Sequence, residues 1–333
     1  MKALIYERPG NPSEVLKVVT VATPILGPKQ VLLKMKIMPI NPMDLATIRG
    51  VYRTPQKTPT IPGYEGLGEV VQVGGQVEIL EVGMFVLMIP IKSPGWTNGV
   101  WQEFVCVDEA ETLPIPQSVN PLETPQFFNT ILTAWVLVKR ELKLRNNQTL
   151  LLTAAGSGVG RLILGLSKLI GFSVIAVVRR ADQVEEIKAL GAKAVICSAT
   201  EDISQRTMSI TNLKGVDAVI DAVGGEVSAQ CFRTLAERGT MIVFGLLDLE
   251  RNSSFDVRKM LFYNLTVKGF WLPGWWTNNN LPSRIQAVNE AFEMIRTGHM
   301  APKIEKAFSL SEFKLALAES EKAGRTGRIV FSN

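Results

Sequence analysis

The middle of the chain, from about residue 149 to residue 244, alternates short apolar runs with segments of helical spacing. Strands that alternate with helices and are apolar throughout indicate a parallel sheet covered on both faces. The sequence therefore predicts an α/β class fold with a doubly wound sheet. The expected strands are 149–153, 173–178, 194–196, 217–221 and 240–244, and the expected helices are 158–170, 181–190 and 226–235, with one more before residue 217.

The flanking segments have a different pattern. Residues 1 to about 115 carry short strand-like runs separated by Gly and Pro, at 31–40, 67–73, 84–89 and 101–107. Residues 121–142 have helical spacing, and the chain after about residue 265 reads as a strand, two amphipathic helices and a final strand at 328–331. We expect a β-rich domain formed by residues 1–120 and 268–333, with a doubly wound domain of residues 121–267 inserted between its two parts.

Composition and charge exclude several classes of protein. With 46% hydrophobic and 20% charged residues, the chain is neither collagen-like nor disordered. The net charge of +5 is not gathered into basic runs, so we expect no nucleic acid partner. The longest apolar stretch, 162–178, is interrupted by Lys168, Gly171 and Ser173, which favours a helix followed by a strand over a membrane span.

The sequence also bears on metal and location. One histidine and three widely spaced cysteines cannot furnish a four-ligand zinc site of the usual kinds unless carboxylates supply most of the ligands, so no metal is expected. The N-terminal residues lack the apolar core of a signal peptide, and the cysteine usage fits a reducing compartment. We therefore expect a cytoplasmic protein.

A glycine-rich turn, A-A-G-S-G-V-G at 154–160, lies between an apolar run and a helix. Small residues let the backbone approach a pyrophosphate, whose charge is met by the helix N-terminus. On the G-x-G-x-x-G fingerprint the three glycine positions hold Ala155, Ser157 and Gly160, so the match is degenerate. A tight strand-to-helix turn without a ligand is the alternative.

The end of the next expected strand distinguishes between two cofactors. A sheet that binds NAD places an acidic residue about 20 residues on, against the ribose hydroxyls. Here the strand ends in Arg179 and Arg180, and the first carboxylate is Asp182. Guanidinium groups bind phosphate through their fork geometry, which predicts NADPH. The alternative is a pair of ordinary exposed arginines, although cations oppose the dipole at a helix start.

The whole chain resembles the medium-chain dehydrogenase/reductases. The zinc alcohol dehydrogenases of that superfamily carry a cysteine-containing turn and a G-H-E motif, and the matching stretches here are P-I-N-P-M-D (39–44) and P-G-Y-E-G (62–66). Asn41 replaces the cysteine, Tyr64 replaces the histidine, and Glu65 remains. The resemblance implies a zinc-free branch with a GroES-like β-rich catalytic domain and a Rossmann domain.

Within that branch, the chain is similar to the 2-enoyl thioester reductases and to the quinone oxidoreductases. Gly50-Val51-Tyr52 matches both groups. The N-P-M-D turn, Ser157 and the G-F-W-L-P-G-W segment (269–275) resemble the enoyl reductases more closely. Trp101 is followed by Gln102, where the enoyl reductases usually have arginine.

The resemblance implies transfer of hydride from NADPH to the β-carbon of a conjugated enoyl thioester. Tyr52 is the expected proton donor or carbonyl polariser, Tyr64 is the reserve candidate, and Asn41 would hold the substrate or the cofactor ribose. Reduction of a quinone or enone on the same fold is the alternative, and a non-catalytic NADPH-binding protein is a third reading. The substrate is expected to be a small molecule or an acyl thioester, and the family is commonly a homodimer.

The resemblance also implies a set of cofactor contacts, in which the glycine-rich turn meets the pyrophosphate and the arginine pair meets the adenosine phosphate. The expected cofactor-binding residues are Thr130, Gly156, Ser157, Gly158, Val159, Arg179, Arg180, Phe244, Gly245, Leu246, Leu247, Phe270, Trp271, Leu272 and Arg328.

Overall fold

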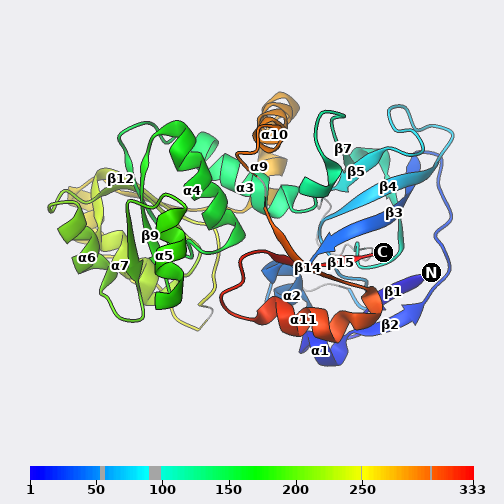
Figure 1. Cartoon of the computed structure of the whole chain (residues 1–333), viewed down its shortest axis with the longest axis horizontal. Helices are drawn as coiled ribbons and strands as arrows, with labels where there is room; N and C mark the ends of the chain where they lie inside the picture. The colour runs from blue at the N-terminus through cyan, green and yellow to red at the C-terminus, as the bar shows by residue number, and fades with distance from the viewer. Residues whose placement is uncertain (53–56, 90–98, 249, 301) are drawn as a thin grey trace. The chain divides into compact units, whose positions relative to one another are not determined.

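The computed structural model describes residues 1–52, 57–89, 99–248, 250–300 and 302–333 (Figure 1). The chain forms two compact units. The first contains residues 1–130 and 292–333, and the second contains residues 131–291. No helix among the described residues combines the length and the apolar character needed to cross a membrane.

The first unit is built on a seven-stranded sheet in the order β14-β15-β3-β4-β5-β7, with β6 also paired to β3. Its strands pair antiparallel except for β14 and β15, which run parallel. A separate hairpin pairs β1 (Lys2–Ile5) with β2 (Lys17–Thr20). The sheet strands are β3 (Gln30–Pro39), β4 (Gly66–Val73), β5 (Phe85–Met88), β6 (Phe104–Asp108), β7 (Thr112–Pro114), β14 (Ile304–Phe308) and β15 (Arg328–Ser332).

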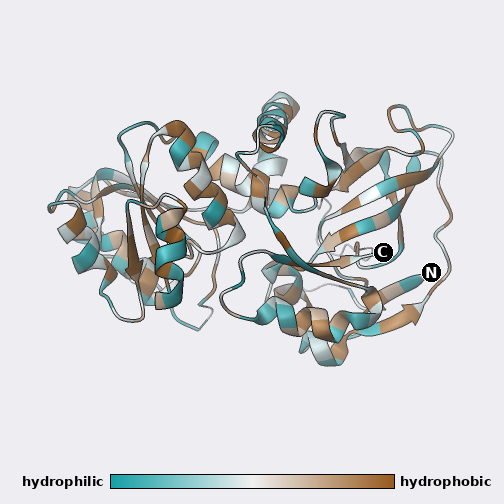
Figure 2. Cartoon of the chain, viewed as in Figure 1, coloured by the Kyte–Doolittle hydropathy of each residue, from teal (hydrophilic) through white to brown (hydrophobic). Residues whose placement is uncertain are grey.

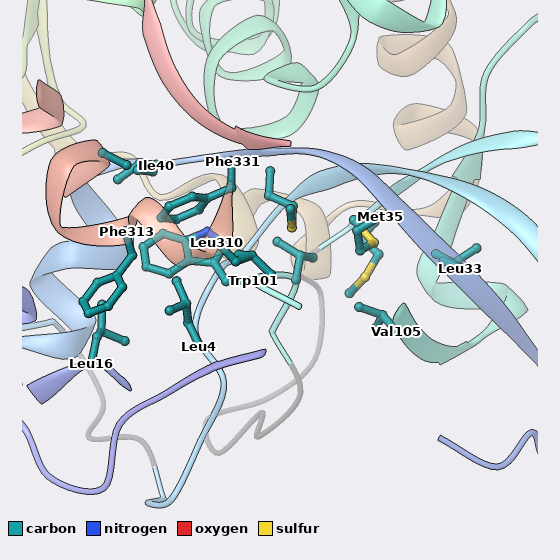
Figure 3. Packing of buried hydrophobic residues seen from close by; sticks show 14 of the residues in the cluster. Leu4, Leu16, Leu33, Met35, Ile40, Trp101, Val105, Leu310, Phe313 and Phe331 are labelled. Atoms are coloured by element: carbon teal, nitrogen blue, oxygen red, sulfur yellow. The ribbon is translucent and has the colours of Figure 1, made fainter. Parts of the chain in front are cut away.

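Trp101 lies at the centre of the first unit's core (Figure 3). Its ring meets that of Phe331 edge to face, with centroids 5.1 Å apart, and its indole N–H donates to the carbonyl oxygen of Pro39 at 3.4 Å. Aromatic side chains of this size contribute a large part of the apolar area that a core buries. The core thus packs β3 and β15 against the helices of the unit. These helices are α1 (Pro12–Val15), α2 (Pro42–Ile48) and α11 (Phe313–Glu321), and the unit also has the single turns η1 (Glu109–Glu111), η2 (Pro121–Glu123) and η6 (Leu310–Glu312).

The second unit is built on a six-stranded sheet in the order β10-β9-β8-β11-β12-β13, in which all neighbouring pairs are parallel. The strand order reverses between β8 and β11. In open α/β sheets a ligand binds at the carboxyl ends of the strands where the order reverses. The strands are β8 (Thr149–Leu152), β9 (Ser173–Val178), β10 (Ala194–Cys197), β11 (Val216–Asp221), β12 (Leu235–Val243) and β13 (Thr266–Gly269).

Local sequence explains where the first long helix of this unit begins and ends. Ser157 caps the N-terminus of α4 (Gly158–Ile170), and Gly171 ends it with a φ of 92°, a conformation that glycine adopts readily. The strands of the sheet are mostly hydrophobic, and its helices carry both hydrophobic and hydrophilic residues, as expected for helices with one face against the sheet (Figure 2). The other helical segments are η3 (Phe127–Leu132), α3 (Thr133–Val136), η4 (Leu137–Glu141), η5 (Ala181–Gln183), α5 (Val184–Ala189), α6 (Ile203–Ile210), α7 (Gly225–Arg233), α8 (Val257–Phe262), α9 (Leu272–Asn278) and α10 (Leu281–Arg296).

The α/β class and the doubly wound sheet are confirmed, and the chain after residue 265 differs from our expectation. Strand β13 pairs with β12, so the chain stays with the second unit through residue 291. We had expected the boundaries at 120/121 and 267/268, whereas the compact units meet at 130/131 and 291/292. Strand β14 was not expected, because its sequence I-E-K-A-F is mostly half-buried or exposed and lacks a clear alternation.

Candidate active site

A buried polar cluster in the first unit is built around Glu65, which directly precedes β4. Its Oε1 accepts a hydrogen bond from Asn41 Nδ2 at 2.9 Å, and its Oε2 accepts the backbone N–H groups of Phe128 at 3.1 Å and Asn129 at 3.0 Å. Burial raises the pKa of Glu65, while these donors and the charge of Arg328 act against that shift. Glu65 therefore fixes the start of α2 against the π-helical turn η3.

Asp44, in the first turn of α2, is the second buried carboxyl of the cluster. Its Oδ2 accepts the backbone N–H of Asn41 at 2.7 Å, and its Oδ1 accepts the backbone N–H of Tyr64 at 3.0 Å. Burial raises the pKa of Asp44 to about 7; the hydrogen bond from Asn41 opposes the shift, and the charge of Glu65 adds to it. A carboxyl group of this kind changes its protonation state near neutral pH.

Arg328, at the start of β15, lies beside these two carboxyls. Its Nε donates to Gln126 Oε1 at 3.3 Å, and burial lowers its pKa while the charge of Glu65 raises it. Among the described residues, further polar atoms of the cluster that are buried without a hydrogen-bond partner include Asn41 Oδ1, Gln126 Nε2 and Thr130 Oγ1. Such atoms are uncommon in folded proteins and mark places where a water or ligand completes the hydrogen bonding.

Two tyrosines lie next to this cluster. The rings of Tyr52 and Tyr64 meet edge to face, with centroids 6.2 Å apart. Thr47 Oγ1 donates to the carbonyl oxygen of Met43 at 2.8 Å and lies 3.1 Å from Tyr64 Oη. Because a threonine hydroxyl has one hydrogen, Tyr64 is the donor in that second contact. Thr47 and Tyr64 also line a small hollow with Tyr6 and Thr60.

The glycine-rich turn of the second unit connects β8 to α4 and is closely packed. Ser157 Oγ accepts the backbone N–H of Gly160 at 3.1 Å, which caps α4. A Cβ atom at Gly160 would lie 2.6 Å from the carbonyl oxygen of Ala155, so only glycine fits where helix and turn meet. The first-turn amides of Gly158 and Val159 have no partner inside a helix and are the groups that bind anions.

Arg161, which the sequence analysis did not identify, supports this turn from inside α4. Its Nε donates to the carbonyl oxygen of Gly156 at 3.0 Å. Its two terminal nitrogens donate to the carboxylate of Glu186 in α5 at 2.8 and 2.9 Å. This bidentate pair ties the turn to α5. Gln183 also packs against the turn, since a Cβ atom at Gly156 would lie 2.7 Å from its Nε2.

The two arginines at the end of β9 differ in their surroundings. Arg179 is exposed, and its guanidinium has no ion-pair partner in the described part of the chain. Arg180 Nε donates to Asp182 Oδ1 at 2.9 Å, and its Nη2 donates to Asp182 Oδ2. This hydrogen bonding raises the pKa of Arg180 and lowers that of Asp182. The sequence analysis identified both arginines but not the ion pair.

The other side of the switch point is held by Thr153 and Asp221. Thr153 Oγ1 donates to Asp221 Oδ1 at 2.6 Å and accepts the backbone N–H of Ala222 at 2.9 Å. Asp221 also accepts the backbone N–H groups of Val223 at 3.1 Å and Gly224 at 3.0 Å. These bonds fix the carboxyl ends of β8 and β11. Neither residue was identified from the sequence, because they are 68 positions apart.

The remaining expected cofactor contacts of the second unit follow β12 and β13. The backbone N–H of Phe244 donates to the carbonyl oxygen of Asp221 at 2.9 Å, and that of Phe270 donates to the carbonyl oxygen of Val243 at 2.8 Å. The fold thus brings both segments to one edge of the sheet, where Leu246, Leu247 and Trp271 are exposed and Leu272 is buried. Gly245 packs against Ala222. A Cβ atom at Gly245 would lie 3.0 Å from the carbonyl oxygen of Ala222.

Comparison with known proteins identifies the family. The family model described as Alcohol dehydrogenase GroES-like domain matches residues 27–117, and the one described as Zinc-binding dehydrogenase matches residues 158–291. A mitochondrial enoyl-[acyl-carrier-protein] reductase of Caenorhabditis elegans is 30% identical over 289 residues, which cover 85% of this chain and 80% of the relative. The chain belongs to the medium-chain dehydrogenase/reductase family.

Two further relatives agree with this assignment. The mitochondrial enoyl-[acyl-carrier-protein] reductase of Arabidopsis thaliana is 28% identical over 331 residues, covering 98% of this chain and 86% of the relative. The structure of a quinone oxidoreductase of Pseudomonas syringae pv. Tomato DC3000 superposes with a TM-score of 0.86 at 25% identity, covering 100% of this chain and 99% of that one. This medium-chain reductase is therefore an oxidoreductase of a pyridine-nucleotide family, and the GroES-like and Rossmann domains are confirmed.

The residues at the position of the family's catalytic metal do not fit a zinc ion. An amide and a phenol, Asn41 and Tyr64, stand where the zinc alcohol dehydrogenases have cysteine and histidine. Both oxygens of Glu65 already accept hydrogen bonds within the protein. Across the described residues, no group of three or more His, Cys, Asp or Glu side chains could hold a metal ion. Zinc sites use nitrogen, thiolate and free carboxylate ligands, and this donor set offers too few of them.

Proposed function

We propose that this medium-chain reductase reduces the conjugated carbon–carbon double bond of a 2-enoyl thioester, using NADPH and no zinc. The observation that carries the proposal is the Asn41–Glu65 hydrogen bond, which joins two of the residues at the metal position to each other. The ring of Tyr64, the residue before Glu65, meets the ring of Tyr52. The names of the Caenorhabditis elegans and Arabidopsis thaliana relatives support the enoyl thioester as substrate.

NADPH, when bound, supplies the hydride that reduces the β-carbon. That transfer leaves negative charge on the thioester oxygen and requires a proton at the α-carbon. The phenol hydroxyl of Tyr52 carries one hydrogen, so it can donate a hydrogen bond to the carbonyl oxygen or a proton to carbon. We propose that Tyr52 polarises the carbonyl or protonates the α-carbon, with its ring supported by Tyr64.

Asn41 has a more specific role than the sequence predicted. Its Nδ2 donates to Glu65, and its buried Oδ1 is a hydrogen-bond acceptor that has no partner in the part of the chain that the structure describes. An acceptor recognises a hydroxyl group and does not stabilise a negatively charged oxygen. We therefore propose that Asn41 binds a hydroxyl of the cofactor ribose, and that the buried hydroxyl of Thr130 contributes in the same way.

The other proposed cofactor contacts divide by chemistry. The turn amides and helix start would bind the pyrophosphate, the guanidinium groups would bind phosphate, and the segments after β12 and β13 would lie along the nicotinamide. They are Gly156, Ser157, Gly158 and Val159 for the pyrophosphate, Arg179, Arg180 and Arg328 for phosphate, and Phe244, Gly245, Leu246, Leu247, Phe270, Trp271 and Leu272 for the nicotinamide.

We also propose a homodimer. Strand β13 lies at the edge of the parallel sheet, and α8 next to it in sequence exposes Val257, Leu261 and Phe262 by 73%, 73% and 77%. Exposed apolar patches and unpaired sheet edges are typical of subunit interfaces. The cytoplasmic location stays a prediction from the sequence, and the curated relatives are named as mitochondrial proteins.

Reduction of a quinone or enone is the second candidate. It is supported by the Pseudomonas syringae quinone oxidoreductase, whose structure superposes over the whole of this chain. An acyl thioester needs a long channel, whereas a quinone needs a short flat slot. Substrate preference therefore decides between the two reductases, and lack of turnover with either class would favour a non-catalytic NADPH-binding protein.

The test is NADPH oxidation by purified protein with crotonyl- and hexenoyl-thioesters, compared with naphthoquinone and a simple enone. We expect thioester turnover that falls about 100-fold or more in Tyr52→Phe, as for loss of a general acid. Tyr263→Phe, which alters an exposed tyrosine of the other unit, is the matched control. Turnover of quinone or enone with inert thioesters would overturn the proposal.

A further inference from the structure

We propose that Asp182 is a specificity-determining residue, whose carboxylate competes with the cofactor's 2′-phosphate for Arg180. This inference rests on the proposed use of NADPH and adds a residue that acts against it. As a consequence, the protein discriminates only modestly between NADPH and NADH and can also use NADH. The reason is that Arg180 is already neutralised by its ion pair with Asp182 before the nucleotide binds.

The location of the pair beside the turn follows from the sheet. β9 is the neighbour of β8, and the glycine-rich turn leaves β8 at the same edge at which β9 ends, directly before Arg179. The backbone N–H of Ala155 donates to the carbonyl oxygen of Val177 at 3.2 Å, and Gln183, the residue after Asp182, packs against Gly156. The Arg180–Asp182 pair therefore lies at the edge where the adenosine ribose of a dinucleotide binds in this fold.

The geometry of the ion pair shows what a phosphate must displace. Two nitrogens of Arg180, Nε and Nη2, donate to the two carboxylate oxygens of Asp182, which is the same bidentate arrangement that a guanidinium forms with phosphate. A phosphate that takes this face of Arg180 must break the pair and then lies next to the Asp182 carboxylate. Arg179, which has no such partner in the described part of the chain, carries the remaining attraction.

The exposure of the two side chains sets the size of the effect. The side chains of Arg180 and Asp182 are 40% and 57% exposed, so solvent screens both their attraction and the repulsion between carboxylate and phosphate. The effect is therefore a factor of about two to five in binding rather than an absolute block. The same carboxylate can accept hydrogen bonds from ribose hydroxyls when no 2′-phosphate is present, as in sheets that bind NAD.

The probes are adenosine 2′,5′-bisphosphate and AMP, which differ only in the 2′-phosphate, titrated calorimetrically into the full chain. In Asp182→Asn, we expect the Kd for the bisphosphate to fall by about two- to fivefold while the Kd for AMP stays unchanged. We also expect Arg180→Gln to weaken bisphosphate binding more in the Asp182→Asn background than in the wild type. Glu226→Gln, which breaks the comparably exposed pair with Arg233 on α7, is the matched control and leaves both Kd values unchanged.

The outcomes separate this inference from the proposed cofactor. If Asp182→Asn weakens bisphosphate binding, or leaves it unchanged while Arg179→Gln and Arg180→Gln weaken it, the competition is wrong and NADPH recognition stands. If the wild type binds both probes equally and neither arginine variant changes the bisphosphate Kd, the proposed NADPH preference fails and the competition fails with it. A gain confined to the bisphosphate in Asp182→Asn supports the inference.

Discussion

Replacing Asp44 with asparagine should change how the stability of the protein depends on pH. Burial raises the pKa of this carboxyl from its ordinary value of 3.8 to about 7 in the folded protein. A group whose pKa is raised on folding binds more protons in the folded state between the two values. Its contribution to stability is complete below about pH 4 and is lost as the pH rises through about 7.

The magnitude follows from the two pKa values. Each pKa unit corresponds to about 1.4 kcal/mol, so moving from pH 5.5 to pH 8 should cost about 2 kcal/mol of unfolding free energy through Asp44. In Asp44→Asn this part of the pH dependence is absent. The variant also loses one of the two backbone hydrogen bonds that the carboxylate accepts, from Asn41 or Tyr64, which costs about 1–3 kcal/mol at either pH.

Urea denaturation of the wild type and of Asp44→Asn at pH 5.5 and pH 8 measures the effect. At pH 5.5 the wild type should have the larger unfolding free energy. The difference in unfolding free energy between wild type and variant should be about 2 kcal/mol smaller at pH 8 than at pH 5.5. Asp217→Asn is the matched control, because Asp217 is exposed and also accepts a backbone N–H, that of Thr149. A gap for Asp44→Asn that is equal at the two pH values would refute the reasoning.

Two further substitutions have outcomes set by single contacts. Glu65→Gln keeps the shape of the side chain but removes the charge beside Arg328 and one of its two acceptor oxygens, which serve Asn41 and the amides of η3, so it should lower the unfolding free energy by about 3 kcal/mol in urea denaturation. A loss below about 1 kcal/mol would contradict this. Gly160→Ala places a Cβ atom against the carbonyl oxygen of Ala155, so AMP binding measured by calorimetry should weaken by about tenfold or more, whereas Gly298→Ala, away from the turn, should leave it unchanged. Equal AMP affinity in the two glycine variants would contradict the close packing at the turn.

Much of the second unit could be predicted because its signals are local. The helix over 158–170 and the strand over 173–178 have the bounds expected from the sequence, since Ser157 and Gly171 mark the ends of the helix within the chain's own pattern. The glycine-rich turn was recognisable as a strand-to-helix turn even with Ala155 and Ser157 in place of glycines, because its position between strand and helix is itself informative.

The polar cluster of the first unit could not be predicted as a whole. Asp44, Glu65 and Arg328 lie on α2, before β4 and at the start of β15, and only the pairing of β3 with β4 and β15 brings these elements together. The family resemblance identified Asn41 and Tyr64 as substitutions at a metal position, but it did not indicate that Asn41 donates a hydrogen bond to Glu65. The Arg180–Asp182 pair is close in sequence, yet its formation depends on side-chain geometry that no residue pattern reports.

The carbon atom that receives the hydride tests most directly the central claim, that the protein reduces the double bond of a 2-enoyl thioester. Crotonyl-thioester reduced with NADPH that carries deuterium in both positions at nicotinamide C4, in ordinary water, should give the butyryl product with one deuterium at the β-carbon. The same reaction with unlabelled NADPH in deuterium oxide should place one deuterium at the α-carbon, as a proton from a phenol in exchange with solvent requires. Both positions are read from the product by NMR. A product without deuterium at the β-carbon, or no saturated product while naphthoquinone is reduced, would contradict the account.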